Sequence, residues 1–413
     1  MVMRVFRTLC LGLAVTLVSA AMPAAAQQPT AVFTLADALR RAMDESPEGA
    51  AALARVEAAG RALEYAGHLP NPIFELRSEN WGARAPSPGL PLDIYATVTQ
   101  TVEFGGKRDA RRGVARADSQ AALAAASVVR HDVALDVSRL YMEALRAREH
   151  QRALAAQSRD MAELVRILTS RVAVGSTAES DLLKMRTEEA RAAADVVRTR
   201  LAASRALAQL TARLGVDTSL EALMLPAAPP PTAGDHLSAV ARRADVSAAA
   251  RAVDAARQSA RLENARGIPD ANVHAGMKRT TGFNTGVVAV TVPIPLFDRN
   301  RTARILAQGR ALAAEREQKA VERRALGEIR ATRNAAAALI EHAANARTAL
   351  VEPARGAREA ARAAFQSGAL DVLRLLDAER VFTGASIVAI DLEIDAVVTA
   401  IEARLAAGED PLP

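Results

Sequence analysis

Residues 99–112 read TQTVEFGGKRDARR and contain the change from strand to helix that decides the fold. Before Phe104 apolar and polar residues alternate, as they do in a half-buried strand. After Gly105 and Gly106, residues 107–172 contain no proline and are rich in alanine, arginine and glutamate. As a helix they would extend over roughly 100 Å, at about 1.5 Å per residue, a length that no compact domain needs. The stretch therefore predicts a strand that leads directly into a very long helix.

This design occurs twice in the chain. Phe104 precedes a helical stretch that breaks at Gly175, and Phe297 precedes another that breaks at Gly368, so both intervals are 71 residues long. A fixed internal offset is the mark of a duplicated structural unit. Each half is predicted to contain a helix, a strand, a turn, a strand, a long helix, a break and a second long helix. Two leucine pairs keep the same offset of 193 positions: Leu182 with Leu375, and Leu183 with Leu376.

Alternation predicts strands at 71–80 and 92–104 in the first half, and at 271–279 and 286–296 in the second. Turn-forming residues join the two strands of each pair. Matching the apolar faces of the halves needs an offset one residue shorter than the repeat, so a bulge is expected near Pro295, which cannot donate to a strand ladder. The apolar faces are formed by Leu92, Ile94, Ala96, Val98, Val102 and Phe104, and by Val288, Val290, Val292, Ile294 and Leu296.

Aromatic residues gather in or beside these strand windows. Aromatic side chains concentrate where a strand barrel meets a membrane interface. Strands that pack in an ordinary soluble core are the alternative, and the long helices disfavour it. Six of the eleven aromatic residues that follow residue 26 lie there: Phe74, Trp81, Tyr95, Phe104, Phe283 and Phe297.

The first residues predict export from the cytoplasm. Two arginines precede an apolar run at 9–21, and alanines ending at Ala26 provide a cleavage site, so residues 1–26 have the order of a signal peptide. The run is too short for a helix to span about 30 Å of hydrocarbon, which disfavours a retained anchor. Cys10 lies within it, so the mature chain is expected to have no cysteine and no lipid anchor.

The remaining chain divides at a proline-rich segment. No stretch has the roughly 18 apolar residues of a membrane helix, so any passage through a membrane would use strands. The expected parts are the first repeat at 27–224, a linker at 225–235, the second repeat at 236–408 and a short tail at 409–413.

Composition disfavours several functional classes. The net charge of +6 falls to +4 without the signal, and the basic residues alternate with acids along helices, which makes nucleic-acid binding a poor explanation. No GxSxG elbow, P-loop or dinucleotide fingerprint is present, so the chain is not expected to be an enzyme or to bind a cofactor. No HxxxH or HExxH spacing predicts a metal site among the histidines: His68, His131, His150, His236, His274 and His342.

Four motifs at these repeated positions resemble the TolC family of outer-membrane efflux proteins over nearly the whole mature chain. Near the start of the mature chain, the sequence from Thr34 resembles the opening motif of the family; it reads TLADALRRAMDESPEGAAA. The sequence from Thr99, TQTVEFGGKRDARR, is similar to the strand-to-helix junction in the branch of the family for cobalt, zinc and cadmium efflux. GSTAESDLL from Gly175 and GALDVLRLLDAER from Gly368 resemble the two helical-hairpin tips of the family.

The resemblance implies an internally duplicated α+β membrane protein. It implies a homotrimer in which each chain gives four strands to one outer-membrane barrel, while the long helices form a tunnel across the periplasm. The implied partners are a periplasmic adaptor, an inner-membrane proton-driven pump of the RND class and outer-membrane lipid. The implied function is an exit duct that passively conducts heavy-metal cations. Independently, four strands cannot close a barrel in lipid, so some oligomer is required.

The resemblance also implies a gate at the periplasmic mouth. Family members commonly carry acids six and nine residues after the second hairpin glycine. Asp181 and Asp377 are expected to line the closed tip, paired with Lys184 or Arg374 of neighbouring helices, which would bias or latch ion passage. Four solvated helix residues are the alternative. The counted positions are Asp181 and Lys184 after Gly175, and Arg374 and Asp377 after Gly368.

The glycines themselves have structural explanations. A turn between antiparallel helices often needs a residue with positive φ, which predicts hairpin turns at Gly175 and Gly368. Gly105 and Gly106 are expected to serve the strand-to-helix junction in the same way. Ordinary loop glycines are the alternative.

Two other functions remain open from the sequence. A periplasmic helical adaptor or structural protein would explain the signal and the alanine-rich helices, but not two aromatic-rich strand pairs at equivalent places. A channel for drugs or for type I protein secretion would keep the fold and change only the cargo.

Overall fold

The computed structural model describes residues 32–80, 92–230, 234–280 and 282–412. The predicted signal peptide with Cys10, Trp81 with the loop that follows it, and part of the linker lie outside these residues. The described helices are α1 Leu35–Glu45, α2 Pro47–Tyr65, α3 Lys107–Ala173, α4 Glu179–Leu214, a 3₁₀ turn η1 Leu220–Ala222, α5 His236–Arg242, α6 Ala244–Arg266, α7 Arg301–Ala346, a π turn η2 Arg347–Val351, α8 Glu352–Gln366 and α9 Val372–Ala406. The strands are β1 Ile73–Glu79, β2 Asp93–Val102, β3 Ala271–Thr280 and β4 Phe283–Thr291.

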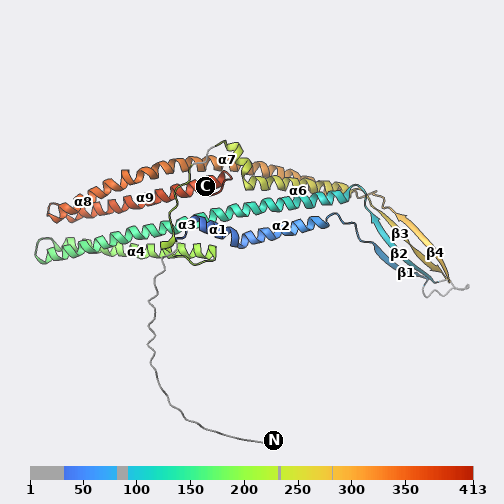
Figure 1. Cartoon of the computed structure of the whole chain (residues 1–413), viewed down its shortest axis with the longest axis horizontal. Helices are drawn as coiled ribbons and strands as arrows, with labels where there is room; N and C mark the ends of the chain where they lie inside the picture. Colours follow the sequence, from blue (N-terminus) through green and yellow to red (C-terminus); the bar gives the residue numbers. More distant parts are fainter. Residues whose placement is uncertain (1–31, 81–91, 231–233, 281, 413) are drawn as a thin grey trace, which may run out of the picture.

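The molecule is elongated, with the sheet at one end and two helical hairpins at the other (Figure 1). The first hairpin consists of α3 and α4, and the second of α7, α8 and α9. The 67 residues of α3 give it a length of roughly 100 Å, as the sequence predicts. It runs from the sheet to the far end, so one helix joins the two ends of the chain (Figure 1).

Length alone does not make these helices membrane spans. Within the described segments, none of them combines the length and the apolar content needed to cross a bilayer.

The second long helical stretch differs from the first by a π turn, η2, just before Pro353. Proline lacks a backbone N–H, and its ring clashes with the carbonyl group four residues earlier in a regular helix. Widening the turn there relieves this conflict, and such turns are common points of helix bending. The irregular turn therefore lies directly before Pro353.

The four strands form one antiparallel sheet in the order β1-β2-β3-β4. The pairing of β2 with β3 joins the two repeats across the middle of the sheet. In one row Phe74 lies opposite Val98, Val98 opposite Ala275, and Ala275 opposite Val288. This row belongs to the predicted apolar face, whose large side chains are exposed in the chain. The opposite face carries polar side chains such as Thr99, His274 and Lys278, together with the apolar Ile73 and Val287.

The predicted fourth strand is wrong at its end. It was placed at 286–296, whereas β4 runs from Phe283 to Thr291. Pro293 and Pro295 follow, and neither has an N–H to donate to a ladder, so the pairing stops before them. The bulge expected near Pro295 therefore has no strand in which to form.

Gly276 provides a test of the β2–β3 pairing. A Cβ atom there would lie 2.2 Å from the carbonyl oxygen of Ala96 and 2.6 Å from Cα of Thr97, both on β2. Gly276→Val should therefore force the central strands apart and lower stability by about 1–3 kcal/mol, the range for overpacking. Gly286→Val on β4 is the control, because nothing lies within 4 Å of its added Cβ. Equal thermal unfolding of both variants would contradict the register.

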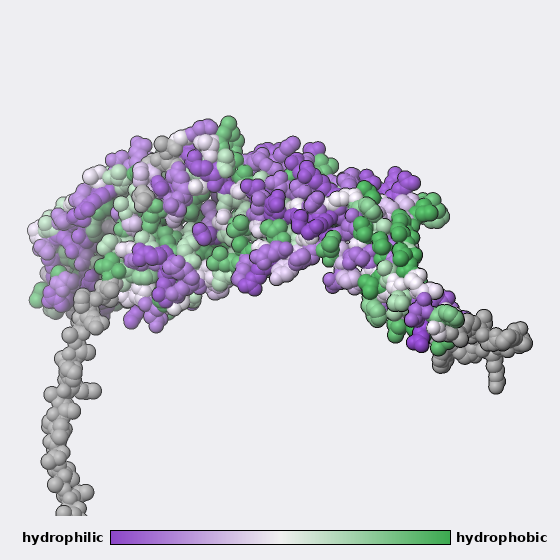
Figure 2. Space-filling model, turned by 45° about the vertical axis from the view of Figure 1, so that its right-hand side comes forward, coloured by the Kyte–Doolittle hydropathy of each residue, from purple (hydrophilic) through white to green (hydrophobic). Residues whose placement is uncertain are grey.

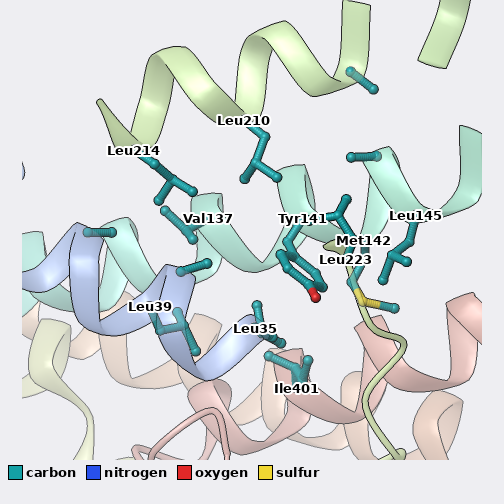
Figure 3. Packing of buried hydrophobic residues seen from close by; sticks show 14 of the residues in the cluster. Leu35, Leu39, Val137, Tyr141, Met142, Leu145, Leu210, Leu214, Leu223 and Ile401 are labelled. Atoms are coloured by element: carbon teal, nitrogen blue, oxygen red, sulfur yellow. The ribbon is translucent and has the colours of Figure 1, made fainter. Parts of the chain in front are cut away.

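The largest core cluster lies at the middle of the long axis, where α1, α3, α4 and α9 meet. Tyr141 of α3 is fully buried at its centre (Figure 3). Its hydroxyl oxygen lies 2.8 Å from the carbonyl oxygen of Phe33 and accepts the N–H of Met224 at 2.9 Å. These contacts attach the chain before α1 and the segment after η1 to the long helix. Leu35, Leu210 and other apolar side chains surround the ring (Figure 3).

Candidate functional site at the hairpin tips

Each hairpin turns at a glycine with positive φ. Gly175 has φ of 72° and Gly368 has φ of 82°, and nothing lies within 4 Å of an added Cβ at either position. Backbone conformation rather than space therefore favours glycine there. After the second turn, Asp371 caps α9 by accepting the N–H of Arg374 at 2.9 Å.

The four residues singled out by the sequence lie just after these turns. Asp181 is half-buried, and its Oδ1 lies 3.5 Å from Nζ of Lys184, one turn along the same helix. Arg374 is exposed, and its Nε lies 4.0 Å from Oδ2 of Asp371 on its own helix. Asp377 is exposed and has no ion pair with any described residue. Within one chain, the described residues therefore show no pairing of these four between the hairpins.

The hairpins are instead joined by a second apolar cluster near the tips. Leu168 of α3, Met185 of α4 and Leu375 of α9 are fully buried in it. Phe365 of α8 belongs to the same cluster and is almost fully buried. Both hairpins thus share one core at this end, and neither can move as a unit without opening it.

A charged group missed by the sequence analysis lies beside this core. Nη2 of Arg362 on α8 lies 2.8 Å from Oδ2 of Asp160 on α3, and the same guanidinium donates a hydrogen bond to Glu379 on α9. Arg358, one turn earlier on α8, lies 3.5 Å from the same Asp160 oxygen. We call Asp160, Arg358, Arg362 and Glu379 the inter-hairpin charge cluster, because it links α3 of the first hairpin to α8 and α9 of the second.

Burial makes this cluster energetically important. The Glu379 side chain is 1% exposed, and an ionised carboxylate so far from water requires a cationic partner. The hydrogen bond from Arg362 to Glu379 raises the pKa of the guanidinium, so Arg362 remains a cation at every accessible pH. Cζ of Arg358 lies 3.7 Å from the ring centroid of Phe382, which adds a cation–π contact.

Two further contacts cross between the hairpins. Nη2 of Arg380 on α9 lies 2.6 Å from Oε1 of Glu188 on α4. Arg171 on α3 donates to the carbonyl oxygens of Phe365 and Gln366 at 2.9 Å each, which satisfies carbonyl groups at the end of α8. The tips are therefore held by polar contacts on both sides of the shared core.

One signal in the sequence could have revealed Glu379. The buried positions of α9 near the tip recur every three or four residues, as in a helix seam. An acid in that seam is unusual and indicates a buried partner. The seam positions are Val372, Leu375, Leu376, Glu379 and Thr383.

At the other end, the strand-to-helix junctions use residues with positive φ. Gly105 and Gly106 have φ of 75° and 70°, and Asn300 before α7 has φ of 58°. A Cβ on Gly105 would also meet Cδ1 of Ile268 at 2.7 Å. Asp270 accepts the N–H of Phe104 and lies 2.7 Å from Nζ of the buried Lys107. These contacts bind the start of α3 to the second half of the chain.

Two of the histidines lie on or next to the strands. His274 on the polar face of the sheet bonds to Thr99 at 2.7 Å and lies 3.2 Å from Thr291, and His68 stacks edge-on with Tyr65. Throughout the described part of the chain, no group of three or more His, Cys, Asp or Glu side chains could hold a metal ion.

Comparison with known proteins identifies the architecture. The sequence pattern of the family described as outer membrane efflux protein matches residues 38–216 and 237–409, one match in each repeat. The chain belongs to this family. It is therefore an outer-membrane efflux protein, and the two matched ranges agree with the internal duplication.

Individual relatives of this outer membrane efflux protein agree with that assignment. The nickel-cobalt-cadmium resistance protein NccC of Alcaligenes xylosoxydans xylosoxydans is 29% identical over 347 residues, 78% of this chain and 75% of its own length. The cobalt-zinc-cadmium resistance protein CzcC of Cupriavidus metallidurans is 28% identical over 385 residues, 89% and 88% of the two chains.

Solved structures share the fold at lower sequence identity. CusC, described in terms of folding and transmembrane channel formation, aligns with a TM-score of 0.79 and 17% identity over 91% of this chain and 92% of its own. The outer membrane protein VceC of Vibrio cholerae aligns with a TM-score of 0.75 and 20% identity over 91% and 96%.

Proposed function

We propose that three copies of this efflux protein form one outer-membrane channel that conducts heavy-metal cations outward, supplied by a periplasmic adaptor and an inner-membrane RND pump. The observation that carries the proposal is the single antiparallel sheet with an exposed apolar face and two open edges, followed directly by very long helices. Figure 2 shows hydrophobic residues concentrated over the sheet end, beside a mostly hydrophilic helical surface.

The open edges support an assembly of several chains. In lipid an unpaired strand edge leaves backbone groups without hydrogen-bond partners, at a cost of several kcal/mol per group. Pairing β4 of one chain with β1 of the next satisfies both edges and turns the polar faces toward a common lumen. That lumen would contain Thr99, His274 and the ion pair between Lys278 and Asp93, whose Nζ and Oδ2 atoms lie 2.8 Å apart. Three copies of four strands agree with the fold of TolC-like channels.

The proposed cargo follows from the relatives rather than from a binding site. NccC and CzcC are named for resistance to nickel, cobalt, zinc and cadmium. A conducting pore does not need to hold its ion tightly, because a strong site would obstruct passage. The pump would then select the metal, and this chain would act as the duct and carry out no reaction.

The cargo is tested by deleting the gene alone and comparing the mutant with a complemented strain. We expect intracellular zinc, cobalt, cadmium or nickel to rise while sensitivity to a panel of drugs and detergents stays unchanged. Drug sensitivity with unchanged metals would reassign the cargo and keep the channel. Changed export of a protein alone would point to secretion.

We further propose that the tips form the periplasmic gate, with Asp377 and Asp181 facing the mouth. The exposed carboxylate of Asp377, which has no ion pair with a described residue, would attract cations to a narrow opening. Asp377→Ala should lower the permeability ratio of cations to anions, and Arg374→Ala should raise it, because each removes one charge per chain. Single-channel recordings of both variants and of the double mutant measure this. Glu317→Ala, an exposed acid of α7, is the control. If Asp377→Ala, Arg374→Ala and their double mutant all kept the ion selectivity of the wild type, the gate proposal would be contradicted.

A further inference from the structure

The chain that follows β4 keeps the alternation of the strand after leaving the sheet. Val292, Ile294 and Leu296 continue the phase of Val288 and Val290, and all five are exposed. We call residues 292–297 the post-strand segment. The N–H of Leu296 donates to the carbonyl oxygen of Ile294 at 2.9 Å, so the segment turns at Pro295 instead of lengthening the strand. It ends at Phe297, whose side chain is 100% exposed.

Three exposed arginines follow at once. Arg299 donates to the carbonyl oxygen of Pro295 at 3.2 Å, and Arg304 donates to Oδ1 of Asn264 at 2.8 Å. Neither of these, nor Arg301, forms an ion pair with any acid in the described ranges. Two carboxylates lie nearby: Asp298 accepts the N–H of Asn300 at 2.8 Å, and Glu263 accepts a hydrogen bond from Nδ2 of Asn300 at 2.8 Å. The junction therefore has three arginines without an ion pair to any described residue, next to exposed apolar surface.

Apolar and cationic side chains share a groove there. It has a volume of about 540 Å³ and is lined by Arg266, Pro269 and residues 293–300. Arg266 is paired with Glu263 at 2.5 Å, and of the three arginines after Phe297 Arg299 lines the groove, together with the acid Asp298.

We propose that this junction binds anionic phospholipids of the membrane leaflet that faces the helices, with acyl chains against the post-strand segment and phosphates at Arg299, Arg301 and Arg304. The inference rests on the proposed outer-membrane channel, which makes the apolar face of the sheet the lipid face. A phospholipid offers hydrocarbon and negative charge side by side, in the order in which the chain presents apolar residues and arginines. Arginine binds phosphate oxygens through paired N–H groups, and basic residues beside a membrane attract anionic lipids.

A second copy of the chain is the other possible occupant, and charge disfavours it. It would have to place acids against three arginines while covering Phe297. Val288 and Val290 instead lie on the sheet face that would turn away from the lumen in a closed barrel, and Val292, Ile294 and Leu296 are exposed directly after them in the chain. Exposed apolar side chains thus continue along the chain from β4 to Phe297.

The test uses the delipidated full-length protein in a neutral detergent. Native mass spectrometry would measure binding of dioleoyl phosphatidylglycerol and dioleoyl phosphatidylcholine to the wild type and to the triple variant Arg299→Gln, Arg301→Gln, Arg304→Gln. The wild type should prefer phosphatidylglycerol. The triple variant should bind it roughly 100-fold more weakly, because each arginine near an anionic surface contributes a factor of about five. Added salt should reduce the preference.

The control is Arg186→Gln, Arg200→Gln, Arg205→Gln, which removes three exposed arginines from α4 and matches the change in net charge. It should keep the lipid preference of the wild type. Equal binding of the two lipids by the wild type would overturn the inference, and so would an equal loss in the control. If the triple variant no longer formed oligomers but still preferred phosphatidylglycerol, the junction would be a contact with a second copy of the chain, and the lipid proposal would be wrong. Conductance of the wild type in lipid bilayers is measured in a separate experiment. A protein that does not conduct would contradict the channel proposal, whereas the lipid proposal is decided by the binding measurements.

Discussion

Glu379→Ala is expected to lower the free energy of unfolding by about 3 kcal/mol and to increase the leak of the closed channel. The change leaves Arg362 without its buried acceptor, and removing one member of a buried ion pair costs about 3–5 kcal/mol. The lower end applies because Arg362 is partly exposed and keeps Asp160 at 2.8 Å. The loss falls on the contact between the hairpins, so the tips should separate more readily. Thermal unfolding and single-channel current at low voltage measure the two effects.

Two variants separate the ion pair from a general loss of charge. Glu359→Ala removes an exposed acid from α8 in the same hairpin and should leave both properties unchanged. Glu379→Leu combined with Arg362→Met should recover much of the stability, because a buried pair can often be replaced by apolar side chains. Asp160 would then retain Arg358, at 3.5 Å. A Glu379→Ala protein that unfolds and conducts like the wild type would exclude a role for the cluster in holding the tips.

Tyr141→Ala is expected to lower the free energy of unfolding by about 3–5 kcal/mol, the usual cost of emptying a buried aromatic site. The ring is fully buried, and its hydroxyl is the partner of Phe33 and Met224. Tyr141→Phe should cost less, about 1–3 kcal/mol, because it removes only the hydrogen bonds of the hydroxyl and leaves the partly buried backbone groups of Phe33 and Met224 without that partner.

The matched control is Tyr65→Ala, whose side chain lies exposed at the end of α2. Thermal unfolding of the three variants should rank them as Tyr141→Ala, Tyr141→Phe and Tyr65→Ala in order of decreasing effect. If Tyr141→Phe were as stable as the wild type, the hydroxyl could not be what attaches the segments before α1 and after η1 to α3.

The sequence predicted the duplicated architecture well, because its signals are local or periodic. The proline-free run after Gly106 predicted α3 to within one residue at its end, and alternation found both strand pairs. The end of β4 was wrong because hydrophobic alternation continues through residues 292–296, while strand pairing depends on N–H groups that Pro293 and Pro295 lack. Periodicity reports which face a side chain occupies and does not report whether the backbone is paired.

The candidate site was predicted less completely. The turns at Gly175 and Gly368 follow from conformational preference, but Glu379 depends on Asp160 and Arg362, whose positions are far apart in the chain. Only the tertiary packing of α3, α8 and α9 brings them together. The inward orientation of Asp181 and Asp377 depends on neighbouring chains and stays a prediction.

The central claim is that this chain forms an outer-membrane conduit, and recording from the purified protein tests it most directly. The mature protein, extracted from outer membranes with detergent, would be sized by native mass spectrometry and then added to a planar lipid bilayer. We expect assemblies of three chains and discrete, stepwise conductance that favours cations. Release of the protein by mild osmotic shock, as a single chain without conductance, would contradict it and favour a periplasmic adaptor.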